Sequence, residues 1–204
     1  MICTECLPPG ATDHEGRVIE PAYKFEAARC ACSYEGIAKR LITAYKDGDE
    51  QRLADIIANE MLCVARGQST QGSARVDEGK PPADWTQIAD AVIPIPANPV
   101  HLRKRGWNHM GMVAERFARG CQLPLLDILV SSKAADQRQL GRDQRMANRS
   151  GSFSLRQDAS VPCGGTVMLI DDVLTTGATC NAATQVLKSA GVGRVLVVTF
   201  ARVW

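Results

Sequence analysis

The feature that most constrains this chain is an apolar run that ends in two acidic residues and a loop of small residues. Residues 167–170 are apolar, Asp171 and Asp172 follow them, and a loop rich in threonine and glycine extends to Thr179. Four consecutive apolar residues predict a strand buried on both faces of a parallel sheet. Because ligands bind beyond the carboxyl ends of the strands in open α/β sheets, we expect the two carboxylates in a ligand site.

The loop after the acid pair has the composition of an anion-binding turn. Gly177 lets the backbone approach a ligand closely, and Thr175, Thr176 and Thr179 supply hydroxyl groups. A helix predicted at about 177–190 would place its first N–H groups at the loop, where they favour a phosphate. An acid pair can also simply end a strand and cap a turn. The threonine–glycine loop favours a ligand that carries both a hydroxylated sugar and a phosphate.

The sequence does not match other known phosphate-binding motifs. It contains no G-x-x-x-x-G-K-[ST], which excludes a P-loop nucleotidase. The glycines of Gly191-Val192-Gly193 precede a predicted strand instead of following one, so they are not a dinucleotide-binding turn. A receiver domain carries its acid pair after an early strand, whereas here the pair lies on the next-to-last strand.

The composition predicts a soluble globular protein of one main domain. The chain has 204 residues, 45% hydrophobic and 23% charged, and its net charge of +2 predicts no general attraction to nucleic acid or membrane. No apolar run approaches the ~18 residues of a membrane helix, and the N-terminus lacks the pattern of a signal peptide. Because the eight cysteines are scattered, we expect reduced thiols and a cytoplasmic protein.

Strands alternate with helices through the second half of the chain, which predicts an α/β fold with a central, mainly parallel sheet flanked by helices. Residues 1–22 form an irregular N-terminal appendage, and residues 23–204 form the main domain, with a surface loop at 66–84. Hydrophobic periodicity predicts strands at 27–34, 89–95, 125–130, 167–171 and 194–200, and helices at 36–46, 53–64, 108–119 and 177–190.

Three consecutive cations, Arg103, Lys104 and Arg105, lie in a segment (97–106) that we predict to be a basic loop. A solvated basic loop or a nucleic-acid-binding patch would have the same charge. Its position after a strand favours another role, because the loop would face the same crevice as the acid pair. There the cations would neutralise a pyrophosphate group.

Residues 167–179 resemble the phosphoribosyl-pyrophosphate signature of the type I phosphoribosyltransferases. This resemblance implies that Asp171 and Asp172 hold the ribose hydroxyls, as catalytic residues together with Arg105. It also implies that the loop binds the 5′-phosphate, and that Mg²⁺ accompanies the ligand. The implied phosphate-binding residues are Thr175, Thr176, Gly177, Ala178 and Thr179.

Flanking segments resemble the ComF branch of this family. The matching stretches begin at Tyr34-Glu35-Gly36, at Pro94 and at Gln137, and the resemblance covers roughly residues 23–204. It implies that Arg103, Lys104 and Arg105 bind pyrophosphate. The chain departs from the branch pattern at Asn98, Val100, His101 and Ala134.

An arginine-rich segment follows, and three interpretations of it remain open. Its arginines recur at three- or four-residue spacing, so a helix would align them on one side. An exposed basic helix is one interpretation, and a contact with single-stranded DNA is another. The family resemblance implies a third, a flexible loop that closes over the ligand. The residues of this predicted loop are Gln137, Arg138, Arg142 and Arg145.

Cys3 and Cys6 have the spacing of a metal-ligand pair, but a structural zinc site requires four ligands. ComF-like chains often begin with a four-cysteine zinc element, and these two residues resemble its last pair. The alternatives are therefore a zinc site and a vestigial pair without metal.

Two functional hypotheses follow from the sequence. The first is an enzyme that binds phosphoribosyl pyrophosphate with Mg²⁺ and transfers phosphoribose to a nucleobase or another, unidentified acceptor. The second is a non-catalytic ComF-type protein that acts in DNA uptake or DNA processing, through partner proteins or single-stranded DNA. No general base is evident, since His14, His101 and His109 are dispersed and expected at the surface.

Overall fold

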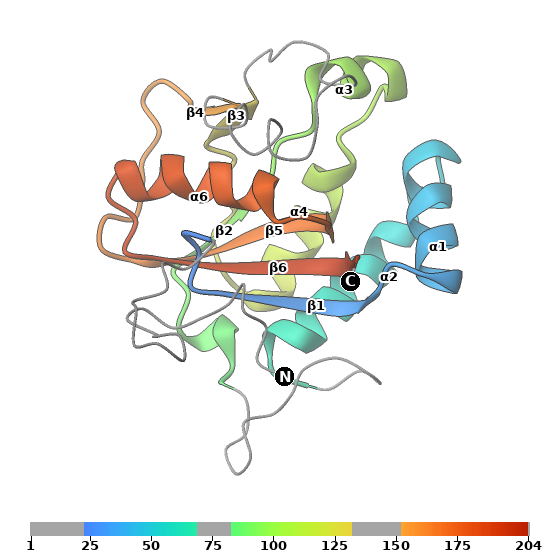
Figure 1. Cartoon of the computed structure of the whole chain (residues 1–204), viewed down its shortest axis with the longest axis horizontal. Helices are drawn as coiled ribbons and strands as arrows, with labels where there is room; N and C mark the ends of the chain where they lie inside the picture. The colour runs from blue at the N-terminus through green and yellow to red at the C-terminus, as the bar shows by residue number, and fades with distance from the viewer. Residues whose placement is uncertain (1–22, 69–82, 132–151, 204) are drawn as a thin grey trace, which may run out of the picture.

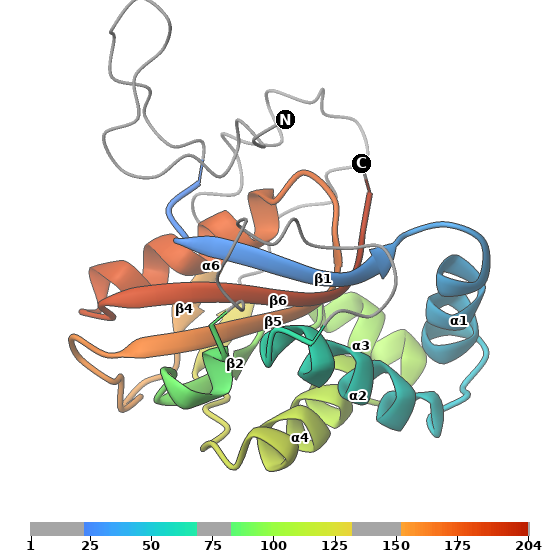
Figure 2. The ribbon, with the colours of Figure 1, turned by 90° about the horizontal axis from the view of Figure 1, so that it is seen from below.

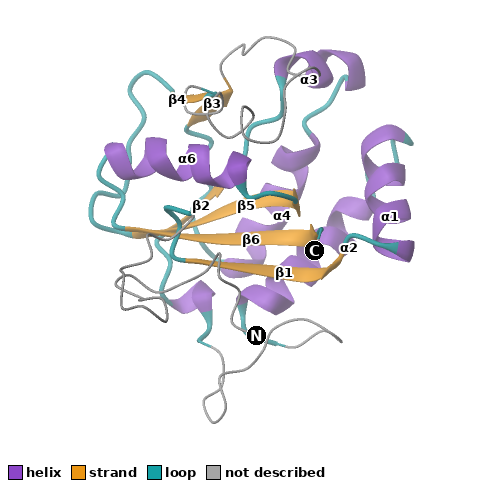
Figure 3. Ribbon diagram, in the orientation of Figure 1, coloured by secondary structure: helices purple, strands orange, loops and turns teal. Residues whose placement is uncertain are grey.

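The computed structural model describes residues 23–68, 83–131 and 152–203 (Figure 3). Its elements in chain order are β1 (Ala27–Ser33), α1 (Gly36–Asp47), α2 (Leu53–Ala65), the 3₁₀ turn η2 (Trp85–Gln87), β2 (Ala91–Pro94), α3 (Pro99–Arg105), α4 (His109–Cys121), β3 (Leu129–Ser131), β4 (Phe153–Leu155), β5 (Thr166–Leu174), α6 (Ala178–Ser189) and β6 (Arg194–Arg202). The predicted N-terminal appendage and most of the predicted surface loop at 66–84 lie outside the described residues.

The centre of the fold is a four-stranded sheet in the order β1-β6-β5-β2, with every neighbouring pair parallel. The apolar run of β5 lies in the middle of this sheet, and residues 167–170 are fully buried. Pairing with β2 ends at Ile170, whereas pairing with β6 continues to Leu174. The carboxyl end of β5 therefore extends beyond β2, and the acid pair lies in this extension.

Helices cover both faces of the sheet, as Figures 1 and 2 show. On one face α6 packs with Leu169 and Val197, and on the other face α2 and α4 pack with Met168 and Ile170. Helix α1 lies beyond the carboxyl ends of the strands (Figure 1). This arrangement confirms the predicted α/β class and brings α1 to the edge where ligands bind in such sheets.

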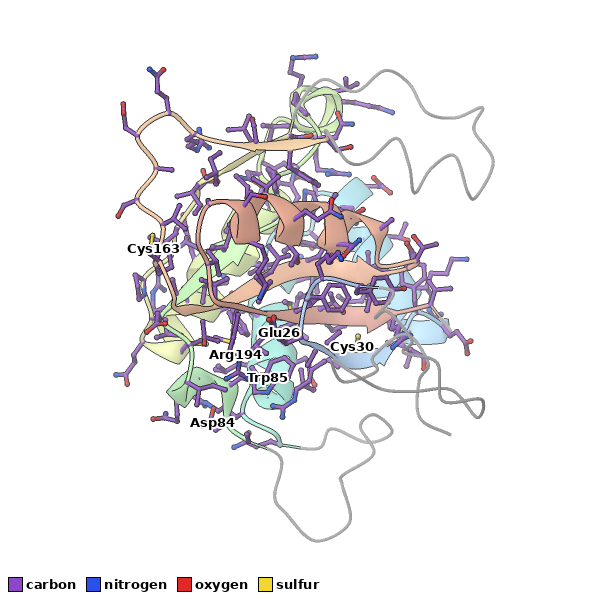
Figure 4. All side chains as sticks on the ribbon, turned by 60° about the vertical axis from the view of Figure 1, so that its left-hand side comes forward. Glu26, Cys30, Asp84, Trp85, Cys163 and Arg194 are labelled. Carbon is purple, nitrogen blue, oxygen red and sulfur yellow. The ribbon has the colours of Figure 1, made fainter. Side chains whose placement is uncertain are left out.

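The segment before β2 is anchored on the face of the sheet opposite α6. Asp84 caps η2 by accepting a hydrogen bond from the N–H of Thr86, and Trp85 lies in the same core as α2 and α4 (Figure 4). The guanidinium of Arg29 lies 4.0 Å above the Trp85 ring and donates to the carbonyl of Ala65. Arg29 thus stabilises the packing of this segment, because its guanidinium is attracted to the face of the Trp85 ring.

Most predicted elements are confirmed. The strands predicted at 27–34, 89–95, 167–171 and 194–200 correspond to β1, β2, β5 and β6, and the four predicted helices correspond to α1, α2, α4 and α6.

Two predictions of local structure are wrong. The predicted basic loop contains helix α3, because the Asn98 side chain caps its first turn and Pro99 suits its first position. The strand predicted at 125–130 adds one bridge to β2 at Leu125. Its end then forms β3, which pairs antiparallel with the unpredicted β4. Three-residue strands are too short for periodicity to reveal them.

None of the helices in the described parts of the chain has the length and apolar character needed to cross a lipid bilayer.

Candidate functional site

Asp171 and Asp172 lie on β5 itself, and their side chains are divided between the two faces of the sheet. Neighbouring residues of a strand project to opposite faces, and the surroundings of the two acids agree with this rule. Asp172 contacts side chains from α1 and α4. Burial raises the pKa of the Cys180 thiol on α6, and the nearby carboxylate of Asp171 raises it further. The two acids therefore do not form one double carboxylate.

Asp172 is the centre of a polar network that we define as Lys46, Arg105, His109 and Asp172. The Asp172 side chain is buried, and its Oδ2 pairs with the ammonium of Lys46 and lies 3.2 Å from Nε2 of His109. The other ring nitrogen of His109, Nδ1, lies 3.1 Å from Nη1 of Arg105. Both of these contacts are made by Oδ2 of Asp172, and Oδ1 takes part in neither of them. The network joins the ends of α1, α3 and β5 through the first residue of α4.

The electrostatics of the network favour a charged Asp172. Burial by itself would raise the pKa of this carboxyl, but the hydrogen bond from His109 and the charge of Lys46 outweigh burial and lower the pKa to about 2. Asp172 is thus ionised and already neutralised by the protein. Asp171 is half-buried, and its Oδ1 accepts the N–H of Asp172 at 2.9 Å.

The expectation that His109 lies at the surface is wrong, since only 7% of it is exposed. Helix α4 packs on the sheet, and its first residue is directed inward to Asp172. The backbone carbonyl of His109 also accepts a 2.6 Å hydrogen bond from the hydroxyl of Tyr45. Sequence periodicity could not reveal this, because the contacts come from a helix and a strand that are each more than 60 residues from His109 along the chain.

The loop between β5 and α6 presents unused backbone donors. Among the described residues, the N–H groups of Thr175, Thr176 and Gly177 donate to no protein acceptor, and that of Ala178 lies 3.5 Å from Oγ1 of Thr176. Thr175 and Thr176 are exposed, and Thr179 lies in the first turn of α6. Free N–H groups at a helix N-terminus attract anions. The loop that the sequence analysis predicted to bind a phosphate therefore has backbone N–H groups without an acceptor among the described residues.

Tyr23, which the sequence analysis did not single out, covers one side of this loop. Gly177 has φ +71°, and a Cβ added to it would lie 2.6 to 3.0 Å from three atoms of the Tyr23 side chain. The Tyr23 hydroxyl donates to the carbonyl of Thr176 at 2.8 Å. Because the C=O and N–H of a trans peptide point in opposite directions, this bond directs the N–H of Gly177 away from Tyr23. Stacking on Phe25, with ring centroids 4.7 Å apart, holds the Tyr23 ring in place.

The three consecutive cations are spread by the helix that carries them. Successive residues of a helix project about 100° apart, so Arg103, Lys104 and Arg105 cannot all face one ligand. Arg103 and Lys104 are exposed. The side chain of Arg105 is 15% exposed and reaches His109 and, at 3.5 Å, the carboxylate of Asp47. Of the three cations, Arg105 is the one whose side chain contacts the network around Asp172 within the described residues.

A cleft of about 170 Å³ lies beside α3, between the proline-rich segment after β2 and the β3-β4 pair. Its walls are mainly apolar, and they include Ile95, Leu102 and Val130. Its charged members, Asp127 and Arg156, form an ion pair at 2.7 Å and therefore neutralise each other.

The other predicted site residues lie outside the described parts of the chain. These are the residues of the predicted flexible loop, Gln137, Arg138, Arg142 and Arg145, and the predicted zinc ligands Cys3 and Cys6. Within the described residues, no three histidine, cysteine or acidic side chains gather as a group that could hold a metal ion.

Two signals in the sequence could have identified the missed network residues. Lys46 belongs to the segment that resembles the ComF branch, and His109 directly follows the Gly106-Trp107-Asn108 stretch of that resemblance. Residues inside a family-like segment that are charged or titratable are candidates for a site even when their partners are distant.

Comparison with known proteins gives one family match and one curated relative. A sequence model of the phosphoribosyl transferase domain matches residues 102–203, half of the 204-residue chain. The chain is 30% identical over 118 residues to competence protein F of Haemophilus influenzae, in an alignment that covers 57% of this chain and 52% of that protein. The chain thus spans about half the length of this relative. The predicted resemblance to the ComF branch agrees with this similarity.

Solved structures show distant similarity. Orotate phosphoribosyltransferase from Aeropyrum pernix has a TM-score of 0.38 and 15% identity, and the alignment covers 97% of this chain and 88% of that chain. An allosteric regulatory enzyme of purine biosynthesis has a TM-score of 0.41 and 17% identity, with coverage of 72% and 26%.

Proposed function

Because the chain belongs to the phosphoribosyl transferase domain family, we propose that it binds 5-phosphoribosyl 1-pyrophosphate with Mg²⁺ and transfers phosphoribose to an acceptor. The observation that carries this proposal is the set of unused loop donors on Thr175, Thr176 and Gly177, next to Asp171 at the carboxyl end of β5. These donors suit the 5-phosphate of the ligand. Carboxylate oxygens accept hydrogen bonds only, so they suit the ribose hydroxyls.

The two acids have different roles in this proposal. Asp171 is half-buried and reaches the α6 side of the site, where it would accept a hydrogen bond from one ribose hydroxyl. Asp172 would offer Oδ1, since Oδ2 is held by Lys46 and His109. Its fixed position would orient the ribose without a change in the charge of the site.

The proposed transfer breaks the bond between the anomeric carbon and the pyrophosphate oxygen. The bonding electron pair leaves with pyrophosphate, a lone pair of the acceptor forms the new bond to the anomeric carbon, and the acceptor loses a proton to water. Positive charge develops on the sugar and negative charge on the leaving group. The protein would act by positioning and electrostatic stabilisation, with Arg105 nearest to the acid side.

Mg²⁺ would enter as part of the pyrophosphate complex. This ion prefers oxygen ligands and usually keeps several waters, with one or two carboxylates and the phosphates of the substrate as its other ligands. Asp171 is the half-buried carboxylate at this edge of β5 that fits such a role. When bound, the ion would neutralise charge on the departing pyrophosphate.

The test is a titration of phosphoribosyl pyrophosphate with Mg²⁺ against the thermal stability of the protein. At a ligand concentration 100 times Kd, stabilisation is about 2.7 kcal/mol, which raises Tm by roughly 5–10 °C for a domain of this size. We expect Asp171→Asn to reduce this shift strongly. Glu115→Gln, on the exposed side of α4, is the matched control and should keep the full shift. An equal shift for Asp171→Asn and the control would contradict the proposed site.

The similarity to competence protein F favours a second candidate, in which the site binds the sugar phosphate without transferring it. Such a protein would act in DNA uptake or DNA processing through partners. Release of pyrophosphate in the presence of a panel of bases separates the two candidates. Binding with release supports the transferase, and binding without release for every base supports the binding protein.

A further inference from the structure

The hydrogen bonds of His109 determine where its proton lies. A guanidinium group has donors and no acceptor, so Nδ1 of His109 must accept the bond from Arg105. The ring proton of a neutral imidazole then lies on Nε2, which donates to Oδ2 of Asp172. The imidazole therefore accepts one hydrogen bond and donates another, so it links Arg105 to Asp172.

The charged groups next to His109 are paired with one another. The ammonium of Lys46 pairs with Asp172, and the guanidinium of Arg105 lies 3.5 Å from the carboxylate of Asp47. The imidazole is 7% exposed and lies between these two pairs, with one ring nitrogen directed to each.

Neighbouring groups fix the orientation of the ring. The Tyr45 hydroxyl donates a 2.6 Å hydrogen bond to the backbone carbonyl of His109, and the rings of Tyr45 and Trp107 pack in a T-shaped arrangement with centroids 5.0 Å apart. Asn108 caps α4 directly before His109. With both ring nitrogens bonded and the backbone held, a rotation of the imidazole would break both of its contacts.

We propose that His109 is a positioning residue that holds Arg105, on the pyrophosphate side, and Asp172, on the ribose side, in one fixed relation. This inference rests on the proposed function and adds to it that the two ends of the site are coupled. A ligand with both a ribose and a pyrophosphate would benefit from the coupling. Ribose 5-phosphate, which is held mainly by the loop after β5, would benefit little.

Two substitutions of His109 separate hydrogen bonding from packing. In His109→Gln the amide carries one donor and one acceptor, so it can bond Asp172 and Arg105 as the neutral imidazole does. In His109→Leu both bonds are lost. A third substitution, Arg105→Met, removes the hydrogen bond at the other ring nitrogen of His109. Because the Arg105 side chain is more exposed than that of Asp172, we expect this substitution to destabilise the fold less. The double variant of His109→Leu with Arg105→Met completes a cycle that measures the coupling.

The measurement is the Kd of phosphoribosyl pyrophosphate with Mg²⁺ and the Kd of ribose 5-phosphate for each folded variant. We expect His109→Leu to raise the Kd of phosphoribosyl pyrophosphate about tenfold or more, which corresponds to about 1.4 kcal/mol. The Kd of ribose 5-phosphate should rise less than about threefold, or about 0.65 kcal/mol. His109→Gln should restore most of the loss. The double variant should bind no more weakly than the weaker single variant.

Four results would overturn the inference. Equal losses for both ligands in His109→Leu would show a general structural effect, and additive losses in the double variant would show that the two ends are independent. If His109→Leu does not fold, a Kd of His109→Gln for phosphoribosyl pyrophosphate more than about fivefold above that of wild type would overturn the inference as well. A wild-type protein that binds neither ligand overturns the proposed function itself, and this inference with it.

Discussion

The two ends of the candidate site are built in opposite ways. The predicted phosphate-binding loop is made of neighbouring residues of one segment, and within the described residues the backbone N–H groups of Thr175, Thr176 and Gly177 donate to no acceptor. The polar network gathers Lys46, Arg105, His109 and Asp172 from four elements, and its members bond one another.

Under the proposed function, the loop contacts the phosphate of the ligand, whereas the polar network maintains the geometry of the site. The loop has donors to offer an anion, and its stability rests on one glycine and one tyrosine. In the network the charged side chains already pair with one another. We therefore expect the network to contribute more to the stability of the fold than the loop does, and to affect ligand binding mainly by positioning side chains. Substitutions at the two ends should therefore differ in size, in pH dependence and in the ligand they affect.

The largest effect is expected from Lys46→Met in the network. This substitution leaves Asp172 buried beside His109 without its cation. Removing one partner of a buried ion pair costs 3–5 kcal/mol, and because Lys46 is partly exposed we expect a loss near the lower end, about 3 kcal/mol. Urea unfolding measures the change. The control is Arg52→Met, which breaks the exposed pair with Glu50 and should cost less than about 1 kcal/mol; similar losses for both would contradict the buried role of Lys46.

The next effect is expected at the loop, from Gly177→Ala. Gly177 and Gly106 both have positive φ, +71° and +80°, but a Cβ has open space at Gly106 and meets the Tyr23 ring at Gly177. We expect Gly106→Ala to lower the free energy of unfolding by about 1 kcal/mol from backbone strain. Steric contact adds to this strain at Gly177, so Gly177→Ala should lower it by about 2.5 kcal/mol. Equal losses would show that Tyr23 does not press on the loop.

A pH titration separates the two ends further. The pKa of Asp172 is lowered to about 2 from 3.8, so its contribution to stability is present above pH 3.8 and is lost as the pH falls from 3.8 towards 2. The contribution is about 2 kcal/mol. The stability difference between wild type and Asp172→Asn, measured by unfolding from pH 5 to pH 2, should shrink by that amount. The loop carries no acidic or basic side chain, so the difference between wild type and Gly177→Ala should stay constant.

The smallest effect is expected from Tyr23→Phe, which keeps the ring and removes the hydroxyl that holds Thr176. One exposed hydrogen bond contributes about 0.5–1 kcal/mol. We expect ribose 5-phosphate to bind about threefold more weakly, because the N–H of Gly177 is no longer held in one direction. Tyr34→Phe is the control, since the Tyr34 hydroxyl makes no hydrogen bond within the described residues. Equal Kd values for Tyr23→Phe and Tyr34→Phe would show that the Tyr23 hydroxyl does not orient the loop.

Features determined by neighbouring residues were predictable from the sequence. The buried strand β5 follows from four adjacent apolar residues, and the loop and the start of α6 follow from the glycine and threonines after the acid pair. The helices α1, α2 and α4 follow from apolar residues at helical spacing. In each case the physical cause lies within a few residues along the chain.

Features that depend on contacts between distant segments were decided by the tertiary structure alone. The sequence places Asp171 and Asp172 side by side, but the alternation of β5 and the packing of α1 and α4 direct them to different faces and pair Asp172 with Lys46 and His109. Tyr23 reaches Thr176 across 153 positions of the chain. Local patterns record which surfaces become buried, whereas the choice of partner for a buried charge depends on which elements meet, and only the folded chain brings those elements together.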